Sequence, residues 1–409
     1  MAELANQTPW LTIIGIGEDG IAGLGDAAKR RIVAASLVCG GKRHLELADE
    51  LIAGERHTWL SPIERSVEVI RAARGRDVCV LASGDPFFYG MGATLARSIP
   101  AEEMRTIPSP SSFSLAASRL GWALQDIDTV SLHGRPLDLI RPHLQPGAKI
   151  LALTSDEKGP RQLAALLADS GFGGSALIVL EALGGAREKI SHHRAETFAL
   201  EGVDTLNICA IEVVAGPDAR IIPLTAGIDD GLFEHDGQIT KREVRALTLS
   251  ALSPRKGELL LDIGGGSGSI SIEWMLAHPA MRAIAVEGHA ERAERIGRNA
   301  ASFGVPGLQV VTGTAPTALA GLPQADAVFI GGGGSEAGVM EAAIAALKSG
   351  GRLVANAVTL EMEAVLLAHQ ARLGGTLTRI EIARAAPVGG MQGWRPAMPV
   401  TQWVWVKKD

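Results

Sequence analysis

A glycine-rich segment that follows an apolar run carries the clearest chemical signal in the sequence. Residues 259–268 read LLLDIGGGSG, and Glu287 closes the next apolar run, AIAV, at residues 283–286. Glycines lack a Cβ, so a strand that enters such a turn lets the backbone approach a ligand closely. N–H groups at the start of the following helix can bind an anion, and a carboxylate at the tip of the next strand can bind a ribose diol.

The spacing of this segment favours S-adenosylmethionine over a dinucleotide. Glu287 follows Gly266 by 21 positions, close to the roughly 20 that separate glycines from the ribose-binding acid in a βαβ unit. A dinucleotide fingerprint starting at Gly264 needs glycine at position 269, where Ser269 stands. Residues 311–315, VTGTA, fall where a third strand would end against the adenine. We therefore expect the cofactor to be bound by Thr240, Asp262, Gly264, Gly266, Gly268, Glu287 and Ala315.

Two further segments bear on the substrate of this second half. The expected fourth strand ends in four glycines at 331–334, without the Asn/Asp-Pro-Pro-aromatic cluster typical of enzymes that methylate nucleic-acid bases. These glycines either leave room for a bulky acceptor or form a flexible loop. Residues 387–396, PVGGMQGWRP, are expected to form a long loop whose Trp394 and Arg395 close over a flat, anionic substrate; Arg395 could equally be an ordinary surface charge.

The first half carries three turns, each at the end of an expected strand. Residues 15–20, GIGEDG, match G-x-G-x-x-G, but no acid lies between 31 and 46 and the next helix starts near Asp26, which disfavours a dinucleotide. Residues 83–86, SGDP, form a sharp turn that exposes Asp85, and residues 108–112, PSPSS, cap a helix with hydroxyl groups. Three turns at the carboxyl ends of strands predict a crevice at one sheet edge.

Short aliphatic runs alternate with helical periods along the chain, which predicts an α/β protein with parallel sheets. We expect a first domain over residues 1–220, a linker rich in Gly, Asp and Pro over 221–238, and a second domain over 239–409. Thr240 and Glu243 have the spacing of a capping box. The second domain should hold a Rossmann-like, seven-stranded sheet that an antiparallel pair near 377–383 and 401–406 completes.

Composition excludes several classes of protein. The 409 residues carry a net charge of -6, which argues against a protein that coats nucleic acid. No run of about 18 apolar residues occurs and the N-terminus does not read as a signal peptide, so we expect a cytoplasmic protein without membrane spans. The three isolated cysteines do not suggest metal ligands or disulfides, and Cys39 and Cys79 are expected to be buried thiols.

The turns of the first half, taken together, resemble those of the tetrapyrrole methylase family over residues 9 to about 215. Segments 40–45, GGKRHL, and 131–135, SLHGR, resemble the branch that methylates carbon 5 of the precorrin ring. The second half, with 240–245, TKREVR, and the glycine turn, resembles the partner enzyme of that pathway, a class I S-adenosylmethionine methyltransferase. The resemblance implies a two-lobed methylase fold followed by a Rossmann-like methyltransferase fold.

The same resemblance implies function. The first half would methylate carbon 5, and the second would decarboxylate the acetate on carbon 12 and methylate carbon 15, giving precorrin-8 in cobalamin biosynthesis. Each half would bind one S-adenosylmethionine, and relatives suggest a homo-oligomer, dimer or tetramer. The residues expected at the first cofactor site are Gly15, Gly17, Asp85, Ser111 and Ser112.

The chemistry needs alignment more than a strong base, because a sulfonium methyl group is already activated. No metal follows from the sequence, and no catalytic acid or base can be named. Arginines suit the substrate carboxylates best, although each could be a surface charge. The candidates are Lys42, Arg43 and Arg135 in the first half and Arg245, Arg384 and Arg395 in the second. Two alternatives stay open: a two-site S-adenosylmethionine sensor, and a methyltransferase acting on another cyclic tetrapyrrole.

Overall fold

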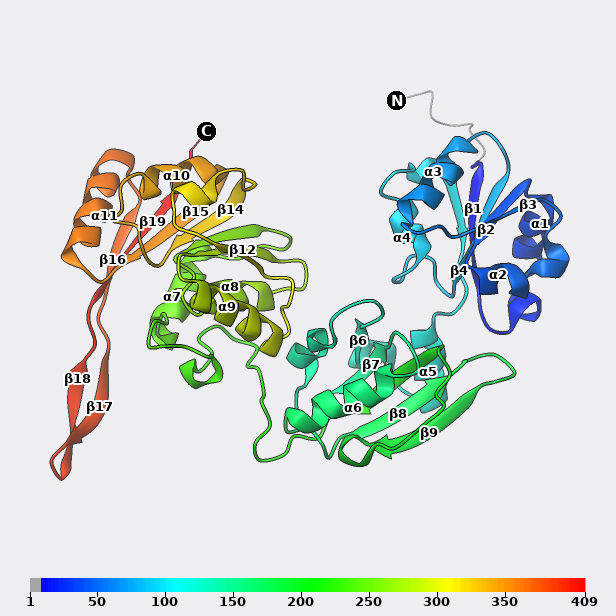
Figure 1. Ribbon diagram of the computed structural model, residues 1–409, viewed down its shortest axis with the longest axis horizontal. Coiled ribbons are helices and arrows are strands. Elements are labelled where there is room, and N and C mark those ends of the chain that lie inside the picture. The colour runs from blue at the N-terminus through cyan, green and yellow to red at the C-terminus, as the bar shows by residue number, and fades with distance from the viewer. Residues whose placement is uncertain (1–8, 409) are drawn as a thin grey trace. The chain divides into compact units, whose positions relative to one another are not determined.

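The computed structural model describes residues 9–408 and shows two compact α/β units (Figure 1). Within these residues, unit 1 comprises 9–137 and 145–220, and unit 2 comprises 138–144 and 221–408.

The first lobe of unit 1 is a five-stranded parallel sheet in the order β3-β2-β4-β1-β5. Helices cover both faces, so the interior strand β1 is buried along its whole length. The strands are β1 (Leu11–Ile16), β2 (Leu37–Gly40), β3 (Glu55–Thr58), β4 (Val78–Ser83) and β5 (Met104–Ile107), and the helices are α1 (Asp26–Ala34), α2 (Lys42–Leu47), α3 (Glu64–Ala72) and α4 (Met91–Leu95).

The second lobe of unit 1 is a mixed sheet in the order β6-β7-β10-β8-β9, in which only β6 and β7 are parallel. Phe113 and Ala117 of helix α5 pack on this sheet. The two sheets confirm the two-lobed architecture. The elements are α5 (Ser112–Leu120), β6 (Asp128–Ser131), β7 (Lys149–Leu153), α6 (Gly159–Asp169), β8 (Ala176–Glu181), β9 (Lys189–Arg194) and β10 (Asn207–Glu212).

Unit 2 is built on a seven-stranded sheet in the order β13-β12-β11-β14-β15-β19-β16, with β19 antiparallel to both neighbours. The Rossmann-like sheet and its final antiparallel pair are therefore confirmed. The strands are β11 (Leu259–Ile263), β12 (Arg282–Glu287), β13 (Gln309–Thr312), β14 (Ala325–Ile330), β15 (Leu347–Ala357), β16 (Thr376–Ile380) and β19 (Val400–Val406).

Five helices cover this sheet, and the two hydrophobic clusters show which face each one buries. The first cluster draws its helical residues from α7 (Arg242–Leu252), α8 (Ser269–Leu276) and α9 (Ala290–Ser302). The second draws them from α10 (Val339–Ala346) and α11 (Leu360–Leu373). The parallel strands therefore end between two helical layers, as a nucleotide-type fold requires.

Three local expectations differ from the structure of unit 2. The expected linker contributes Ile222, Ile228 and Phe233 to the first cluster, so it is part of the folded unit. Helix α7 starts at Arg242 with Lys241 as its N-cap and no side-chain cap, so the capping box is wrong. The expected loop 387–396 lies mostly in a two-stranded hairpin, β17 (Ala383–Val388) and β18 (Met391–Pro396), which extends away from the main sheet (Figure 1).

The cysteines of unit 1 are free and buried, as predicted. Burial raises the pKa of the Cys39 and Cys209 thiols to about 12, so these groups are inert at neutral pH. Within residues 9–408, the helices are too short or too polar to cross a bilayer.

Candidate cofactor and substrate sites

The glycine turn of unit 2 leaves β11 and enters α8, and its geometry explains its composition. Gly264, Gly266 and Gly268 all have φ between +59° and +78°, a region that only glycine occupies without strain. A Cβ on Gly264 would lie 2.7 Å from the backbone nitrogen of Gly332. The glycines that follow β14 are therefore packed against this turn, and part of their role is structural.

Glu287, at the end of β12, fixes the turn. One carboxylate oxygen accepts a hydrogen bond from the Gly266 N–H at 2.8 Å, and the other accepts from the His289 N–H at 3.0 Å. The residue is 5% exposed. Each oxygen keeps a second lone pair, so the carboxylate can still accept hydrogen bonds from a ribose diol.

Asp262 lies at the bottom of the same turn and is almost completely buried. Its Oδ2 accepts a 2.7 Å hydrogen bond from the Ser271 hydroxyl, whereas its Oδ1 has no partner among the described residues. Burial, with a smaller contribution from the charge of Glu287, raises the pKa of Asp262 to about 6. An unpaired buried carboxylate oxygen fits the cationic amino group of a bound amino-acid moiety.

A cavity of about 380 Å³ opens above the turn. One side of the cavity is formed by the turn and by the start of α8, and the other by residues at or after the ends of β14, β15 and β16. Of the expected cofactor residues, Thr240, Asp262 and Gly266 line it. Ala315 instead packs partly against the second hydrophobic cluster. Several other lining residues carry no local sequence signal: Gln238, Ile239, Lys241, Arg292, Asn356, Val358, Ile380, Ile382 and Met398.

The three arginines expected to bind substrate in unit 2 lie in different surroundings. Arg384, on β17, lines the cavity and forms an ion pair with Glu243. Arg395 is its register partner on β18 and is exposed. The expectation for Arg245 is corrected, because its side chain is completely buried and paired with Glu273 at 2.5 Å and Asp230 at 3.1 Å.

Arg245 instead holds the segment that was expected to be a linker. Its guanidinium also donates to the carbonyl oxygens of Ile228 and Thr240. Glu273 in turn accepts from the N–H groups of Gly227 and Ile228, at 2.7 and 3.0 Å. The Arg245–Glu273 ion pair therefore helps to hold residues 227–240 against α7 and α8.

In unit 1, the three turns converge as predicted. A Cβ on Gly15 would lie 1.8 Å from the carbonyl oxygen of Gly84 and 2.6 Å from the nitrogen of Ser109. Ser109 donates its hydroxyl to the Gly15 carbonyl at 2.8 Å and its N–H to the Gly84 carbonyl at 3.2 Å. Gly15 is thus the point where three backbone segments cross.

A hollow of about 390 Å³ lies beside this crossing. Asp85 lines it, with its Oδ1 accepting from the Phe87 N–H at 2.8 Å. Ser111 also lines it and caps α5 by accepting from the Ser114 N–H. Gly17 and Ser112 are not among the residues that line it. Sequence reasoning overlooked Phe87 and Phe88, although three consecutive aromatic residues at 87–89 are conspicuous in a chain with 4% aromatics.

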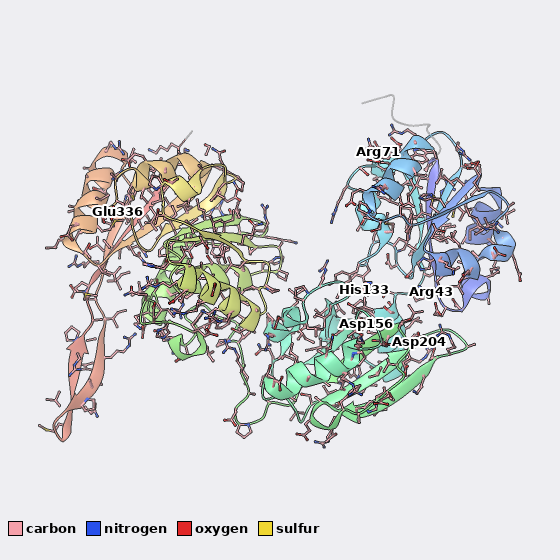
Figure 2. The ribbon with its side chains drawn as sticks, viewed as in Figure 1. Arg43, Arg71, His133, Asp156, Asp204 and Glu336 are labelled. Atoms are coloured by element: carbon pink, nitrogen blue, oxygen red, sulfur yellow. The ribbon has the colours of Figure 1, made fainter. Side chains whose placement is uncertain are left out.

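The basic residues expected to bind substrate in unit 1 also differ in their surroundings. Lys42 is exposed and only 3.9 Å from Glu46, whereas the Arg135 guanidinium lies 5.7 Å from the centre of the Tyr89 ring. Arg43 forms an ion pair with Glu18, which also lies 3.4 Å from Arg187. Figure 2 labels Arg43 and Asp204, the latter a second partner of Arg187.

His44 adds a group that the sequence did not reveal. Its Nε2 lies 2.8 Å from the Ser83 hydroxyl and 3.0 Å from Nη2 of Arg43. Burial, and then the Arg43 charge, lower the pKa of His44 to about 4, so the ring is neutral at physiological pH. Since Arg43 can only donate, Nε2 is the acceptor of that bond.

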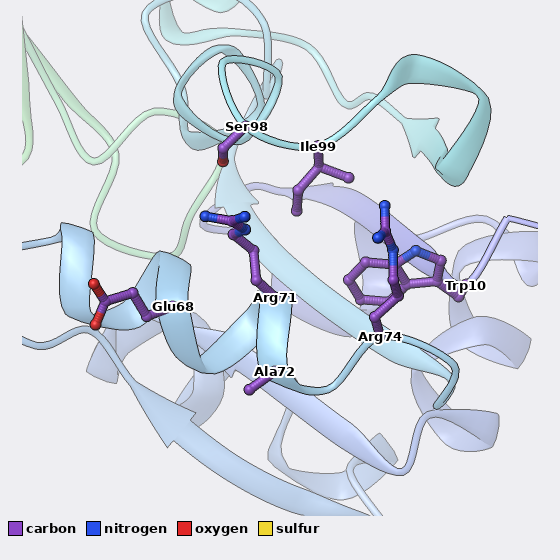
Figure 3. A pocket seen from close by; sticks show the side chains of 7 residues that line it. All are labelled: Trp10, Glu68, Arg71, Ala72, Arg74, Ser98 and Ile99. Carbon is purple, nitrogen blue, oxygen red and sulfur yellow. The ribbon is translucent and has the colours of Figure 1, made fainter.

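A third hollow, of about 370 Å³, lies at the other end of the first sheet (Figure 3). It is lined by Trp10, which precedes β1, and by Glu68, Arg71 and Arg74 near the end of α3. Ligands of open α/β sheets bind outside the carboxyl ends of the strands, so we do not assign a function to this hollow.

Comparison with known proteins decides the family. Residues 11–199 match the profile of tetrapyrrole (corrin/porphyrin) methylases, and residues 231–407 match that of the precorrin methyltransferase domain. The chain is 71% identical, over the whole of both sequences, to a precorrin-6Y C(5,15)-methyltransferase (decarboxylating) of a Sinorhizobium species. The chain belongs to this family of methyltransferases.

Two shorter relatives of the family come from Salmonella typhimurium. A cobalt-precorrin-7 C(5)-methyltransferase is 33% identical over 44% of this chain and 88% of its own length. A cobalt-precorrin-6B C(15)-methyltransferase (decarboxylating) is 33% identical over 40% of this chain and 85% of its own length. Each of these relatives is thus similar to less than half of the chain.

Proposed function

We propose that the chain methylates precorrin-6B at carbons 5 and 15 and decarboxylates the carbon 12 acetate, releasing its carboxyl group as carbon dioxide, which gives precorrin-8 in cobalamin biosynthesis. The full-length relative at 71% identity carries this proposal. The cavity of unit 2, lined by Gly266 and Asp262, supports it independently, as do the unpaired Oδ1 of Asp262 and the hydrogen bond from Gly266 to Glu287.

One cofactor site in each unit is part of the proposal. S-adenosylmethionine supplies an activated methyl group on a positively charged sulfur. In unit 2, Glu287 would bind the ribose hydroxyls, Asp262 the amino group, and the N–H groups of the turn the carboxylate. In unit 1, Asp85 and Ser111 line the hollow in which the second cofactor would lie.

We assign carbon 5 to unit 1, and carbon 15 with the decarboxylation to unit 2. Two separate family profiles and two single-activity relatives, each similar to less than half of the chain, support this division. Arg384 is proposed to bind a substrate carboxylate because it lines the cavity of unit 2. Arg43 and Arg135 are proposed for unit 1, because Arg43 donates to the Ser83 hydroxyl, two residues before Asp85, and Arg135 lies over the Tyr89 ring.

In the decarboxylation the bond between the acetate methylene and its carboxyl carbon breaks, and the electron pair passes into the conjugated ring before a proton replaces the lost group. The protein contributes an apolar wall, formed in part by Val358, Ile380 and Val400, that excludes water from the acetate. A carboxylate that water solvates poorly is less stable, and this favours its departure as neutral carbon dioxide.

The test incubates the full chain with precorrin-6B and S-adenosylmethionine carrying a labelled methyl group. A product with two labelled methyl groups and one carboxyl group fewer is the expected result. A single methyl group, or none, would refute the proposal.

We also propose that the protein is a homo-oligomer. Trp394 and Met391, on the hairpin of unit 2, are 78% and 76% exposed. Such apolar surface on a two-stranded ribbon favours self-association. Sedimentation of the chain and of its W394D variant tests this: the variant should have the lower mass, and a monomeric wild type would contradict it.

A further inference from the structure

A group of three polar side chains in unit 2 lies between α7 and the sheet, and one of them, Asn356, also lines the cavity described above. Thr248 on α7 is fully buried, Gln402 on β19 is 4% exposed, and Asn356 on β15 is half-buried. Asn356 and Gln402 are register partners in the antiparallel pair β15–β19. Polar groups in such a place destabilise a fold unless their hydrogen bonds are satisfied, so each donor and acceptor of this network has to be accounted for.

The hydrogen bonds of this network fix the direction of the Asn356 amide. Thr248 donates its only hydroxyl proton to the carbonyl of Val244 at 2.8 Å, so its oxygen can only accept from the amides. It accepts from Nδ2 of Asn356 at 2.9 Å and from Nε2 of Gln402 at 3.2 Å. The second N–H of Gln402 donates to Oδ1 of Asn356 at 3.0 Å.

Rotating the Asn356 amide by half a turn would break this pattern. Its oxygen would then face the Thr248 oxygen, and its nitrogen would face the Gln402 nitrogen. The observed orientation leaves the second N–H of Asn356 without an acceptor within residues 9–408. Because Asn356 lines the cavity, this N–H is available to a ligand there.

The place of Asn356 in the sheet indicates which ligand it meets. The strand order is β12-β11-β14-β15, so Glu287 and Asn356 lie on opposite sides of the glycine turn. Neighbouring strands are about 4.8 Å apart, which puts the end of β15 roughly 10 Å from the end of β11. The cavity beside Asn356 is lined by the apolar side chains of Val358, Ile380 and Val400, and by Arg384. A large methyl acceptor would therefore lie on the Asn356 side of the cavity, away from the ribose of the cofactor.

We propose that Asn356 binds the tetrapyrrole in unit 2 by donating this N–H to a substrate carboxylate oxygen, and that Thr248 and Gln402 are positioning residues that hold its amide. The inference rests on the proposed function. A flat ring against the apolar wall would bring its peripheral carboxylates to the rim, where a donor of fixed direction selects one orientation of the ring.

The test uses the full chain and its N356A, N356D and Q402L variants, with precorrin-6B and S-adenosylmethionine. In N356A, the KM for precorrin-6B in carbon dioxide release should rise about tenfold, with little change in kcat. N356D should raise that KM further, because a carboxylate repels the substrate. Q402L should raise it less, since the amide is retained but can turn. The affinity of unit 2 for S-adenosylhomocysteine and the methylation of carbon 5 should not change.

N299A is the matched structural control. Asn299 is also a buried amide, but it donates to the carbonyls of Ser267 and Glu234 and does not line the cavity. Its loss should lower the melting temperature without a selective rise in the precorrin KM. An unchanged precorrin KM in N356A would overturn the inference, as would an equal loss of cofactor affinity. If the wild type releases no carbon dioxide, the proposed function itself fails and this inference with it.

Discussion

The Glu287 carboxylate accepts a hydrogen bond from the Gly266 N–H, although 21 residues separate the two in the sequence. The strand-tip acid and the glycine turn of unit 2 are therefore one rigid element before any ligand binds. Preorganisation of this kind lowers the entropy lost on binding.

Replacing Glu287 with glutamine should weaken cofactor binding to unit 2. The side chain keeps its shape but loses the charge that strengthens hydrogen bonds from ribose hydroxyls, and its NH2 group cannot accept from one of the two backbone N–H groups that Glu287 binds. We expect the affinity for S-adenosylhomocysteine to fall roughly tenfold or more, about 1.5–3 kcal/mol. Calorimetric titration measures it, with E291Q, at an exposed site on α9, as the control. Equal affinities in E287Q and the wild type would contradict this role.

Replacing Asp262 with asparagine should change how the stability of unit 2 depends on pH. The pKa of Asp262 is raised from 3.8 to about 6, so between these values the folded state keeps a proton that the unfolded state releases. The contribution of this proton to stability is complete below pH 3.8 and is lost as pH rises through 6, at most about 3 kcal/mol.

The measurement is the free energy of unfolding from pH 4 to pH 8, as the difference between the wild type and D262N. D262N should gain on the wild type as pH rises through this window. The exposed Glu336, labelled in Figure 2, provides the control E336Q. A difference between wild type and D262N that stays constant with pH would show that the pKa of Asp262 is not raised.

Removing the Arg245 side chain should destabilise unit 2 and not act on the substrate selectively. R245A leaves the buried Glu273 carboxylate without its ion pair, a change that costs about 3–5 kcal/mol. Denaturant unfolding measures this cost, and limited proteolysis should show earlier cleavage within residues 221–238. R242A, at an exposed site on the same helix, is the control. A stable R245A with a raised precorrin KM would restore the substrate-binding expectation.

Replacing Asp85 should reduce methylation of carbon 5 and leave methylation of carbon 15 unchanged. D85A removes both the charge and the acceptor for the Phe87 N–H, so methylation at carbon 5 should fall about tenfold or more. D85N can keep the acceptor oxygen and separates the effect of charge from that of the turn. Mass spectrometry of the product with labelled methyl donor measures both positions. D169A, exposed on α6, should behave as the wild type.

Features encoded within one short segment could be predicted from the sequence. The strand–turn–helix around Gly264 and the acid at Glu287 follow from local glycine chemistry and strand spacing, and the structure places them together. The crossing at Gly15 was also predictable, because three turns end parallel strands at one edge. The seven-stranded sheet followed from the alternation of apolar runs.

Features that depend on distant partners could not be predicted. Arg245 looks like any helical arginine until Glu273, 28 positions away, is seen to neutralise it. Nothing in the sequence around Asn356 indicates a role, because its amide is oriented by Thr248 and Gln402, which lie on other elements. The hairpin β17–β18 was misread as a loop because Gly and Pro interrupt its apolar pattern, whereas pairing along its whole length stabilises it.

The position of β19 has a consequence for biosynthesis. Residues 400–406 lie between β15 and β16 inside the sheet of unit 2, with Trp403 buried. While the ribosome is still making the segment before residue 400, β15 and β16 are present but have no strand to join them. In the second lobe of unit 1, β10 likewise lies between β7 and β8, but it is complete by residue 212, well before β19 is made. The nascent chain can therefore complete the sheets of unit 1 while unit 2 still exposes two unpaired strand edges. Unpaired edges promote aggregation, so the chain is most prone to aggregate at this stage.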